Sequence, residues 1–397
     1  MEGNNHNDWT EWEIKASAKL ALKAKKSWSS WQQKQFPEMF DPKNYISGKA
    51  CDHYNLFEKD FDIAKKLSHN AHRFSIEWSR IEPKEGKFDA AQLAHYRAVV
   101  HSLKSRGIEP FVTLWHWTLP EWLSKKGGVL NKDFDGYFCR YTEYVVNGLK
   151  DNVEFWLTLN EPTSVIGNSF VLGNWPPQKM NTFNALRAYK NLAAAHNLAF
   201  NKIHKLSSRA KVGLPNVLAY IEPKNKQSFV DKFMAKFFHY FSNDKLYKMT
   251  RDKHDFLAVQ YYFHDVVGLG KRPEIPKDKL SDMGWEIYPK GIRNVLEEVK
   301  KYNLPVYITE NGIADKDDSR RADFIKNHLI EIHRAINEEG IDVRGYFHWS
   351  LLDNFEWDKG FWPRFGLVEI NYATQERTIR KSALYYKEVA QNNGLEI

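Results

Sequence analysis

EFWLTLNEP (residues 154–162) and VYITENG (residues 306–312) share one pattern: strand-forming residues, then an Asn next to a Glu, then a breaker. In a parallel barrel, catalytic side chains lie at the carboxyl ends of the strands and face one pocket. Glycoside hydrolysis requires two carboxyls across such a pocket, one as proton donor and one as nucleophile or base. We therefore expect Glu161 and Glu310 to form a catalytic pair.

Strand-like runs alternate with helix-period segments along the whole chain, which predicts a parallel sheet. The expected strands are 72–79, 110–116, 154–161, 211–221, 256–263, 305–310 and 343–352. The expected helices are 60–68, 90–106, 135–149, 182–206, 288–302 and 319–339. A closed barrel of this type has eight strands. Nothing before residue 72 reads as a strand, since 11–31 looks helical and 36–48 looks like loop.

The composition predicts one soluble α/β domain spanning residues 1–397. Hydrophobic residues make up 42% of the chain, enough for a large core, and aromatic residues make up 15%. The aromatic excess fits faces that stack on sugar rings, although ordinary core packing explains most of it. The net charge is +8, but the lysines are scattered and form no basic arm, so we expect no nucleic-acid partner.

The sequence also argues against several locations and cofactors. Cys51 and Cys139 match no metal or redox spacing, which favours a reducing, cytoplasmic protein. The polar first residues lack the apolar segment of a signal peptide, and no run approaches a membrane span, so we expect no membrane partner. No glycine-rich phosphate loop and no Ser-His-Asp pattern is readable, so nucleotide and acyl-enzyme chemistry have no support.

Several polar and aromatic residues near the expected strand ends are further candidates for the site. Arg73 lies in a predicted buried strand, where it needs a carboxylate partner that is either the nucleophile or a structural acid. His116, between two tryptophans, either binds a sugar hydroxyl or is structural. The segment from Trp349 to Trp357 combines aromatic rings with acidic side chains, as sugar pockets do, but also suits a packed loop. Tyr262 is a weaker signal.

Taken together and in this order, these motifs resemble glycoside hydrolase family 1, the β-glucosidase and β-galactosidase family. The likeness runs from Glu2 to about Tyr386. The resemblance rests on the motifs CDHY (51–54), RFSIEWSR (73–80), His116, NEP (160–162), TENG (309–312), the stretch 345–357, RFGLV (364–368) and RKS (380–382). The resemblance implies a (β/α)8 TIM barrel that needs no metal or organic cofactor.

The resemblance also implies roles for individual residues. Glu161 matches the acid/base and Glu310 the nucleophile, with Arg73 and Tyr262 beside the nucleophile. The residues that match the binding site of the sugar ring are His116, Asn160, Trp349, Glu356 and Trp357. Glu356 is similar to the family's acceptor for the hydroxyls of an unphosphorylated sugar, and the phosphate-binding set of 6-phosphosugar enzymes is missing. The implied substrates are therefore small β-glucosides and β-galactosides.

Three departures from the family pattern have consequences for the expected activity. The family's first barrel strand, with its sugar-binding Gln, should precede Glu2, where only Met1 stands. Gln260 replaces the usual Asn, and the segment 263–287 looks short. We therefore expect a retaining β-glycosidase with weak activity, a visible defect beside the missing strand, and a monomer. The alternative is a sugar-binding barrel with little or no turnover; a barrel without a sugar site is disfavoured because the pocket motifs are intact.

Overall fold

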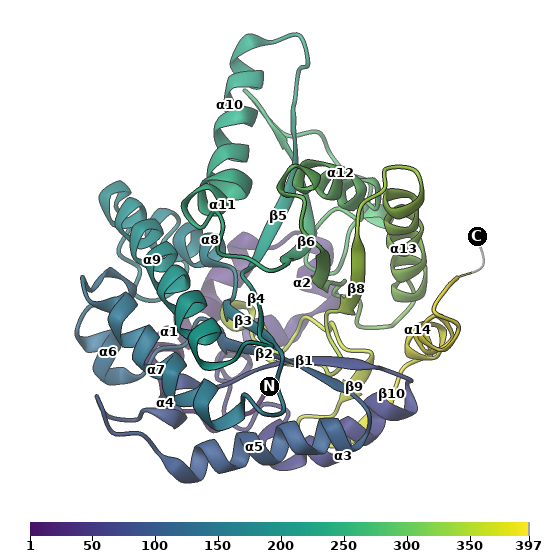
Figure 1. Cartoon of the computed structure of the whole chain (residues 1–397). Helices are drawn as coiled ribbons and strands as arrows, with labels where there is room; N and C mark the ends of the chain where they lie inside the picture. The colour runs from purple at the N-terminus through teal and green to yellow at the C-terminus, as the bar shows by residue number, and fades with distance from the viewer. Residues whose placement is uncertain (396–397) are drawn as a thin grey trace.

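A computed structural model describes residues 1–395 and shows a parallel barrel surrounded by helices (Figure 1). The barrel strands are β1 (Ala71–Ser75), β2 (Glu109–Trp115), β3 (Phe155–Leu159), β4 (Lys211–Gly213), β5 (Pro215–Pro223), β6 (Leu257–Val267), β7 (Val306–Asn311) and β8 (Val343–His348). They pair in parallel in the order β1-β2-β3-β4 and β5-β6-β7-β8.

β4 and β5 are two halves of one barrel strand, because only Leu214 separates them. β4 pairs with β3, whereas β5 pairs with β6, so this strand joins the two groups of four. The described residues thus form seven barrel strands, the number predicted from the sequence. A small antiparallel hairpin, β9 (Val368–Ile370) and β10 (Arg377–Ile379), was not predicted.

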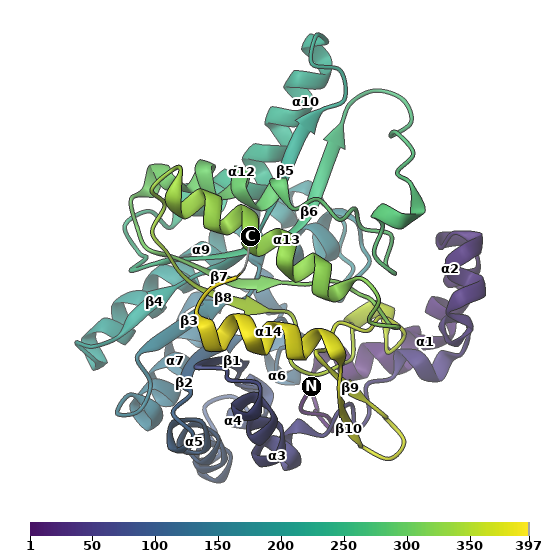
Figure 2. The same cartoon turned by 90° about the vertical axis from the view of Figure 1, so that its right-hand side faces the viewer.

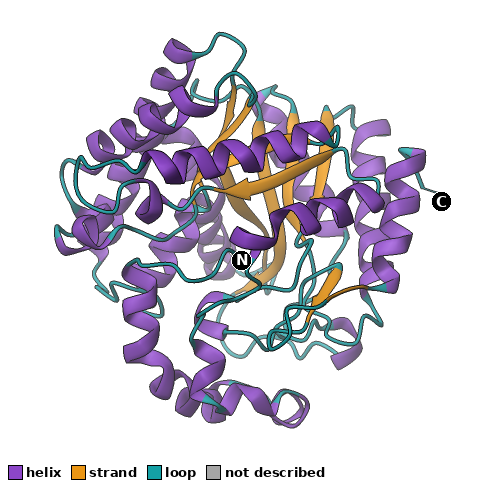
Figure 3. Ribbon diagram, turned by 90° about the horizontal axis from the view of Figure 1, so that it is seen from below, coloured by secondary structure: helices purple, strands orange, loops and turns teal. Residues whose placement is uncertain are grey.

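The α-helices wrap the outside of the barrel (Figure 3). They are α1 (Asp8–Ser27), α2 (Ser30–Gln35), α3 (His53–Lys66), α4 (Trp78–Ile81), α5 (Ala90–Ser105), α6 (Glu121–Lys125), α7 (Phe134–Leu149), α8 (Pro162–Val165), α9 (Thr182–Leu206), α10 (Phe229–His239), α11 (Lys245–Met249), α12 (Lys290–Val299), α13 (Arg321–Asn337) and α14 (Lys381–Asn392). Short 3-10 and π turns (η1–η8) connect them, among them η4 (Ile166–Val171), η5 (Tyr240–Asp244) and η8 (Trp357–Lys359).

Local sequence signals explain several helix boundaries. The side chain of Asn181 accepts hydrogen bonds from the first turn of α9, and Asp89 does the same for α5. Two expected strands were too long. The strand expected at 72–79 ends at Ser75 because α4 begins at Trp78, and the strand expected at 343–352 ends at His348.

Aromatic rings fill the inside of the barrel below the candidate site. Phe111 and Phe155 stack with ring centroids 4.1 Å apart, and Phe256 and Tyr307 pack against both. Phe347 contacts Phe111 from β8. Phe111, Phe155 and Tyr307 lie in the amino-terminal halves of β2, β3 and β7, away from the carboxyl ends where the candidate site residues lie.

The barrel has an open seam between β1 and β8. Within residues 1–395, β1 pairs only with β2, and β8 pairs only with β7. Every residue of β1 is half-buried, whereas β2 and β3 are almost fully buried. A cavity of about 810 Å³ lies against both edges. The sequence predicted a defect at this place, and within residues 1–395 no strand pairs with either facing edge.

α10 and the adjoining ends of β5 and β6 project beyond the rest of the molecule, as both side views show (Figures 1 and 2). β6 is longer than expected and continues to Val267, pairing with β5 as far as Pro223. This two-stranded extension carries α10 away from the barrel. No helix of the described chain is both long enough and apolar enough to cross a bilayer.

Candidate functional site

Glu161 is fixed at the carboxyl end of β3 by backbone hydrogen bonds to both neighbouring strands. The amide of Asn160 donates to the carbonyl of Trp115 at 2.8 Å, and that of Glu161 donates to Pro215 at 2.9 Å. Glu161 has φ +42°, in the left-handed region that is costly for a residue with a Cβ. Such strain at a polar residue in a pocket is typical of functional sites.

The environment of Glu161 favours its protonated form. The side chain is buried, and the Ser164 hydroxyl donates to Glu161 Oε2 at 2.6 Å. Burial raises the pKa of the Glu161 carboxyl, and the nearby negative charge of Glu310 raises it further. A carboxyl that keeps its proton near neutral pH can act as a general acid.

Glu310, on β7, lies among hydrogen-bond donors. Arg73 forms an ion pair with Glu310 Oε1, and Gln260 Nε2 donates to the same oxygen at 2.8 Å. The Tyr262 hydroxyl donates to Glu310 Oε2 at 2.9 Å. Burial and the charge of Glu310 raise the pKa of the Tyr262 hydroxyl well above its usual value, so it stays a donor. Both carboxylate oxygens therefore accept hydrogen bonds, as an ionised nucleophile requires.

Asn160 connects the Glu310 cluster to His116. Its Oδ1 accepts from Arg73 and from Gln260, the latter at 2.9 Å, which leaves its Nδ2 to donate to His116 Nε2 at 3.1 Å. Burial and the charge of Arg73 hold the pKa of His116 well below its usual value. His116 is therefore neutral, accepts at Nε2 and carries its proton on Nδ1, where it can donate to a ligand.

Aromatic rings form one wall of the site. The ring centroid of His116 lies 5.7 Å from Trp357 and 6.2 Å from Trp349. Trp117 contacts Trp357 at 4.6 Å and also donates through Nε1 to the carbonyl of Asn160 at 2.8 Å. Flat aromatic faces can pack on the C–H face of a sugar ring, and the polar groups beside them can bond its hydroxyls.

Glu356 has a buried oxygen with no hydrogen-bond partner in the described chain. Within residues 1–395 its Oε2 forms no hydrogen bond, and burial together with the negative charge of Glu310 raises the pKa of Glu356 to about 8. A buried polar atom without a partner is costly unless a ligand satisfies it. Near neutral pH the protonated carboxyl of Glu356 can both donate to and accept from a neutral hydroxyl.

Hydrogen bonds, ring contacts and charge interactions connect the nine residues singled out in the sequence, but sequence reasoning missed three others. Gln260 was noted only as a departure from the family, although it bonds both Asn160 and Glu310. Ser164 and Trp117 gave no signal beyond their closeness in sequence to candidates. Gln260 could have been found, since it is a lone polar residue in an apolar strand run.

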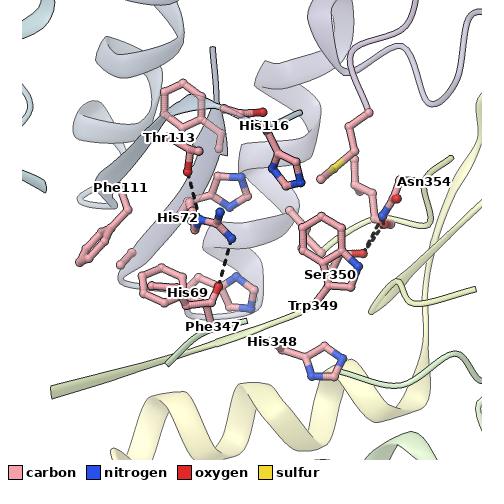
Figure 4. A pocket seen from close by; sticks show the side chains of 18 of the residues that line it. His69, His72, Phe111, Thr113, His116, Phe347, His348, Trp349, Ser350 and Asn354 are labelled. Atoms are coloured by element: carbon pink, nitrogen blue, oxygen red, sulfur yellow. Dashed lines mark hydrogen bonds between the residues drawn. The ribbon is translucent and has the colours of Figure 1, made fainter. Parts of the chain in front are cut away.

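The seam cavity opens beside this site (Figure 4). His116 and Trp349 line one part of it, and His69, His72 and His348 line another. Both ring nitrogens of His348 lack hydrogen bonds to the described chain. The described residues hold no cluster of three or more His, Cys, Asp or Glu suited to a metal ion.

Comparisons with known proteins all match one family of glycosyl hydrolases. The family profile described as "Glycosyl hydrolase family 1" matches residues 21–243 and 238–395. A β-glucosidase A of Thermotoga maritima is 35% identical, covering 87% of this chain and 88% of the relative. A β-galactosidase of Pyrococcus woesei is 31% identical, covering 89% of each.

Solved structures give the same result. A β-glycosidase from Pyrococcus horikoshii superposes with a TM-score of 0.88 at 35% identity, covering 100% of this chain and 92% of that one. A β-glucosidase from Thermotoga maritima in complex with deoxynojirimycin has a TM-score of 0.81 at 34% identity, with coverage of 87% and 88%.

Proposed function

Because this chain belongs to glycosyl hydrolase family 1, we propose that it hydrolyses unphosphorylated β-glucosides and β-galactosides with retention of anomeric configuration. One observation carries the proposal: Glu161 has a raised pKa, whereas neighbouring Glu310 accepts hydrogen bonds at both oxygens. A carboxyl with a raised pKa suits the acid, and a carboxyl that accepts hydrogen bonds at both oxygens suits the nucleophile.

In the first step, Glu310 attacks the anomeric carbon while Glu161 transfers its proton to the leaving oxygen. Tyr262 and Gln260 hold the Glu310 carboxylate in place, and Arg73 balances its charge. The bond to the aglycone breaks as the bond to Glu310 forms, giving a covalent glycosyl-enzyme.

In the second step, the roles of the carboxyls reverse. Once Glu161 has lost its proton, it takes one from a water molecule that attacks the anomeric carbon. The bond to Glu310 breaks, which restores its carboxylate, and Glu161 keeps the proton taken from water, so both carboxyls are back in their starting states. Forming the ester removes the negative charge of Glu310, and this lowers the pKa of Glu161 so that it can serve as a base.

The remaining site residues bind the sugar ring in this proposal. His116, Asn160 and Glu356 offer hydrogen-bonding groups for hydroxyls, and Trp349 and Trp357 supply apolar faces. We further propose that the chain acts as one domain and as a monomer in a reducing compartment, since neither cysteine is in a disulfide.

A second candidate function is sugar binding with little turnover, and the open seam favours it. Arg73, the ion-pair partner of Glu310, is on β1, one edge of which has no paired strand within the described residues. Local opening of that edge would displace Arg73 and lower the rate without abolishing sugar binding.

Chromogenic β-glucoside and β-galactoside assays, combined with titration of deoxynojirimycin, separate the two functions. Hydrolysis that disappears in Glu310→Gln supports the proposed enzyme. Inhibitor binding without hydrolysis supports the second candidate. Absence of both contradicts the two assignments.

A further inference from the structure

α10 presents large apolar side chains to solvent. Phe229, Phe233 and Phe237 are 81%, 61% and 51% exposed, and their four-residue spacing places them in one stripe along the helix. Val230, beside this stripe, is exposed as well, and so is Phe238, which lies on another side of the helix, about 100° round from Phe237. We call Phe229, Phe233, Phe237 and Val230 the α10 apolar stripe.

The opposite face of α10 is the one that packs on the protein. Asp231 and Ala235 are buried there, and the Asp231 carboxylate accepts from the amides of Asn225 and Leu269 at 3.0 and 3.2 Å. A surface helix of a globular protein normally buries its apolar face. α10 has the reverse arrangement, so packing within this chain does not explain its phenylalanines.

The location of α10 leaves the stripe accessible. The helix projects from the barrel together with the ends of β5 and β6, and the two side views show no neighbouring element over its outer tip (Figures 1 and 2). Leu269, whose amide bonds Asp231, is also exposed beside the helix. An accessible apolar surface of this kind marks an interaction site.

Basic side chains surround the stripe. Lys232 and Lys236 are exposed on the helix itself. Further cations are on the adjoining strand ends and loop: Lys224, Lys226, Lys271 and Arg272. The nearby acids Glu222 and Asp265 form ion pairs with Lys226 and Arg272 respectively, while Glu274 and Asp278 are exposed farther along the loop. The surface of α10 is therefore apolar and cationic.

We propose that α10 is an interfacial helix that lies on an anionic phospholipid bilayer. Its phenyl groups enter the boundary between headgroups and acyl chains, and Lys232 and Lys236 contact lipid phosphates. The expectation of no membrane partner rested on the lack of a spanning segment, whereas a helix that lies on the surface needs only one apolar face. This inference is independent of the proposed catalytic roles.

A second copy of the chain fits the surface less well. Two-fold contacts place the same patch of each copy against the other. Such a dimer would bring Lys232 and Lys236 of both copies close together without acidic partners on the helix surface. A bilayer that carries phosphate groups complements the same lysines.

Co-sedimentation with unilamellar vesicles tests the proposal. The full chain is mixed with vesicles of phosphatidylglycerol and phosphatidylcholine, and with vesicles of phosphatidylcholine alone. The test variant is F229S/F233S/F237S, and its matched control, L198S/L384S, removes exposed leucines from other helices. K232Q/K236Q tests the charge, with K59Q/K66Q on α3 as control. Circular dichroism and β-glucosidase activity confirm that each variant is folded.

The wild-type chain and both controls should sediment with the anionic vesicles and bind phosphatidylcholine more weakly. F229S/F233S/F237S should reduce the partition coefficient at least about tenfold, and K232Q/K236Q should reduce only the part that depends on phosphatidylglycerol. No sedimentation of the wild-type chain overturns the proposal. Equal loss in L198S/L384S overturns it too, as does a wild-type dimer, seen by light scattering, that F229S/F233S/F237S dissociates without any lipid binding.

Discussion

Gln260 Nε2 donates to Glu310 Oε1 at 2.8 Å and so joins β6 to the proposed nucleophile. The same nitrogen donates to Asn160 at 2.9 Å, whereas Gln260 Oε1 has no hydrogen-bond partner in the described chain. The residue that departs from the family pattern is therefore part of the hydrogen-bond network that fixes Glu310.

Gln260→Ala should lower kcat/KM for a β-glucoside by about 10- to 100-fold, because Glu310 loses one donor and Asn160 loses another. Gln260→Asn, which keeps an amide on a shorter side chain, should retain more activity. The effect should fall mainly on kcat, since Glu310 is the group that reacts. Steady-state kinetics of both variants measure this, and activity of Gln260→Ala within about twofold of wild type contradicts it.

Glu356→Gln should raise thermal stability more at pH 9 than at pH 5. The pKa of Glu356 is raised to about 8 in the folded state, so its favourable contribution is present below the ordinary pKa and is lost as pH rises toward 8. Glutamine is never charged, so the variant avoids burying a charge at high pH. The difference in unfolding free energy between Glu356→Gln and wild type should change by about 1–4 kcal/mol from pH 5 to pH 9.

Tm values of Glu356→Gln and wild type from pH 5 to pH 9 provide the measurement. The matched control is Glu376→Gln, which replaces an exposed carboxyl. A difference in Tm that is constant with pH, or one that shrinks toward pH 9, contradicts the shift at Glu356.

Neutral glycosides should be preferred to their 6-phosphates. Glu356 offers a carboxyl rather than a cation, and neighbouring Lys359 is already paired with Asp358. A phosphate dianion would therefore lose water without gaining a positive partner. Values of kcat/KM for a β-glucoside and its 6-phosphate test this, and a preference for the phosphosugar refutes it.

The seam should be the least stable part of the barrel. Hydrogen exchange should be faster in β1 and β8 than in β2 and β3, because each seam strand has one edge without a partner strand. A segment of extended, alternately apolar residues fused before Met1 should fill the seam and raise Tm by at least about 5 °C, as several new backbone hydrogen bonds form. Matched protection of all four strands, or an unchanged Tm, contradicts this account.

The sequence predicted the parallel barrel because buried strands such as 155–159 are continuous apolar runs between amphipathic helices. It predicted the candidate site because Glu161 and Glu310 each follow such a run. It did not predict α10 as a projecting helix, because phenylalanines in a sequence are normally interpreted as buried core residues. The role of Gln260 also escaped prediction, because its contacts join β3, β6 and β7 through side chains alone.

Azide rescue of Glu161→Gln tests the central claim, that Glu310 is the nucleophile and Glu161 the acid/base of a retaining reaction. With an activated aryl β-glucoside, the variant should form the glycosyl-enzyme but hydrolyse it slowly, because water has lost its base. Azide needs no base, so it should restore turnover and give β-glucosyl azide, whereas Glu310→Gln should stay inactive on the same substrate. Formation of α-glucosyl azide by Glu161→Gln, or no rescue by azide, would contradict the assignment.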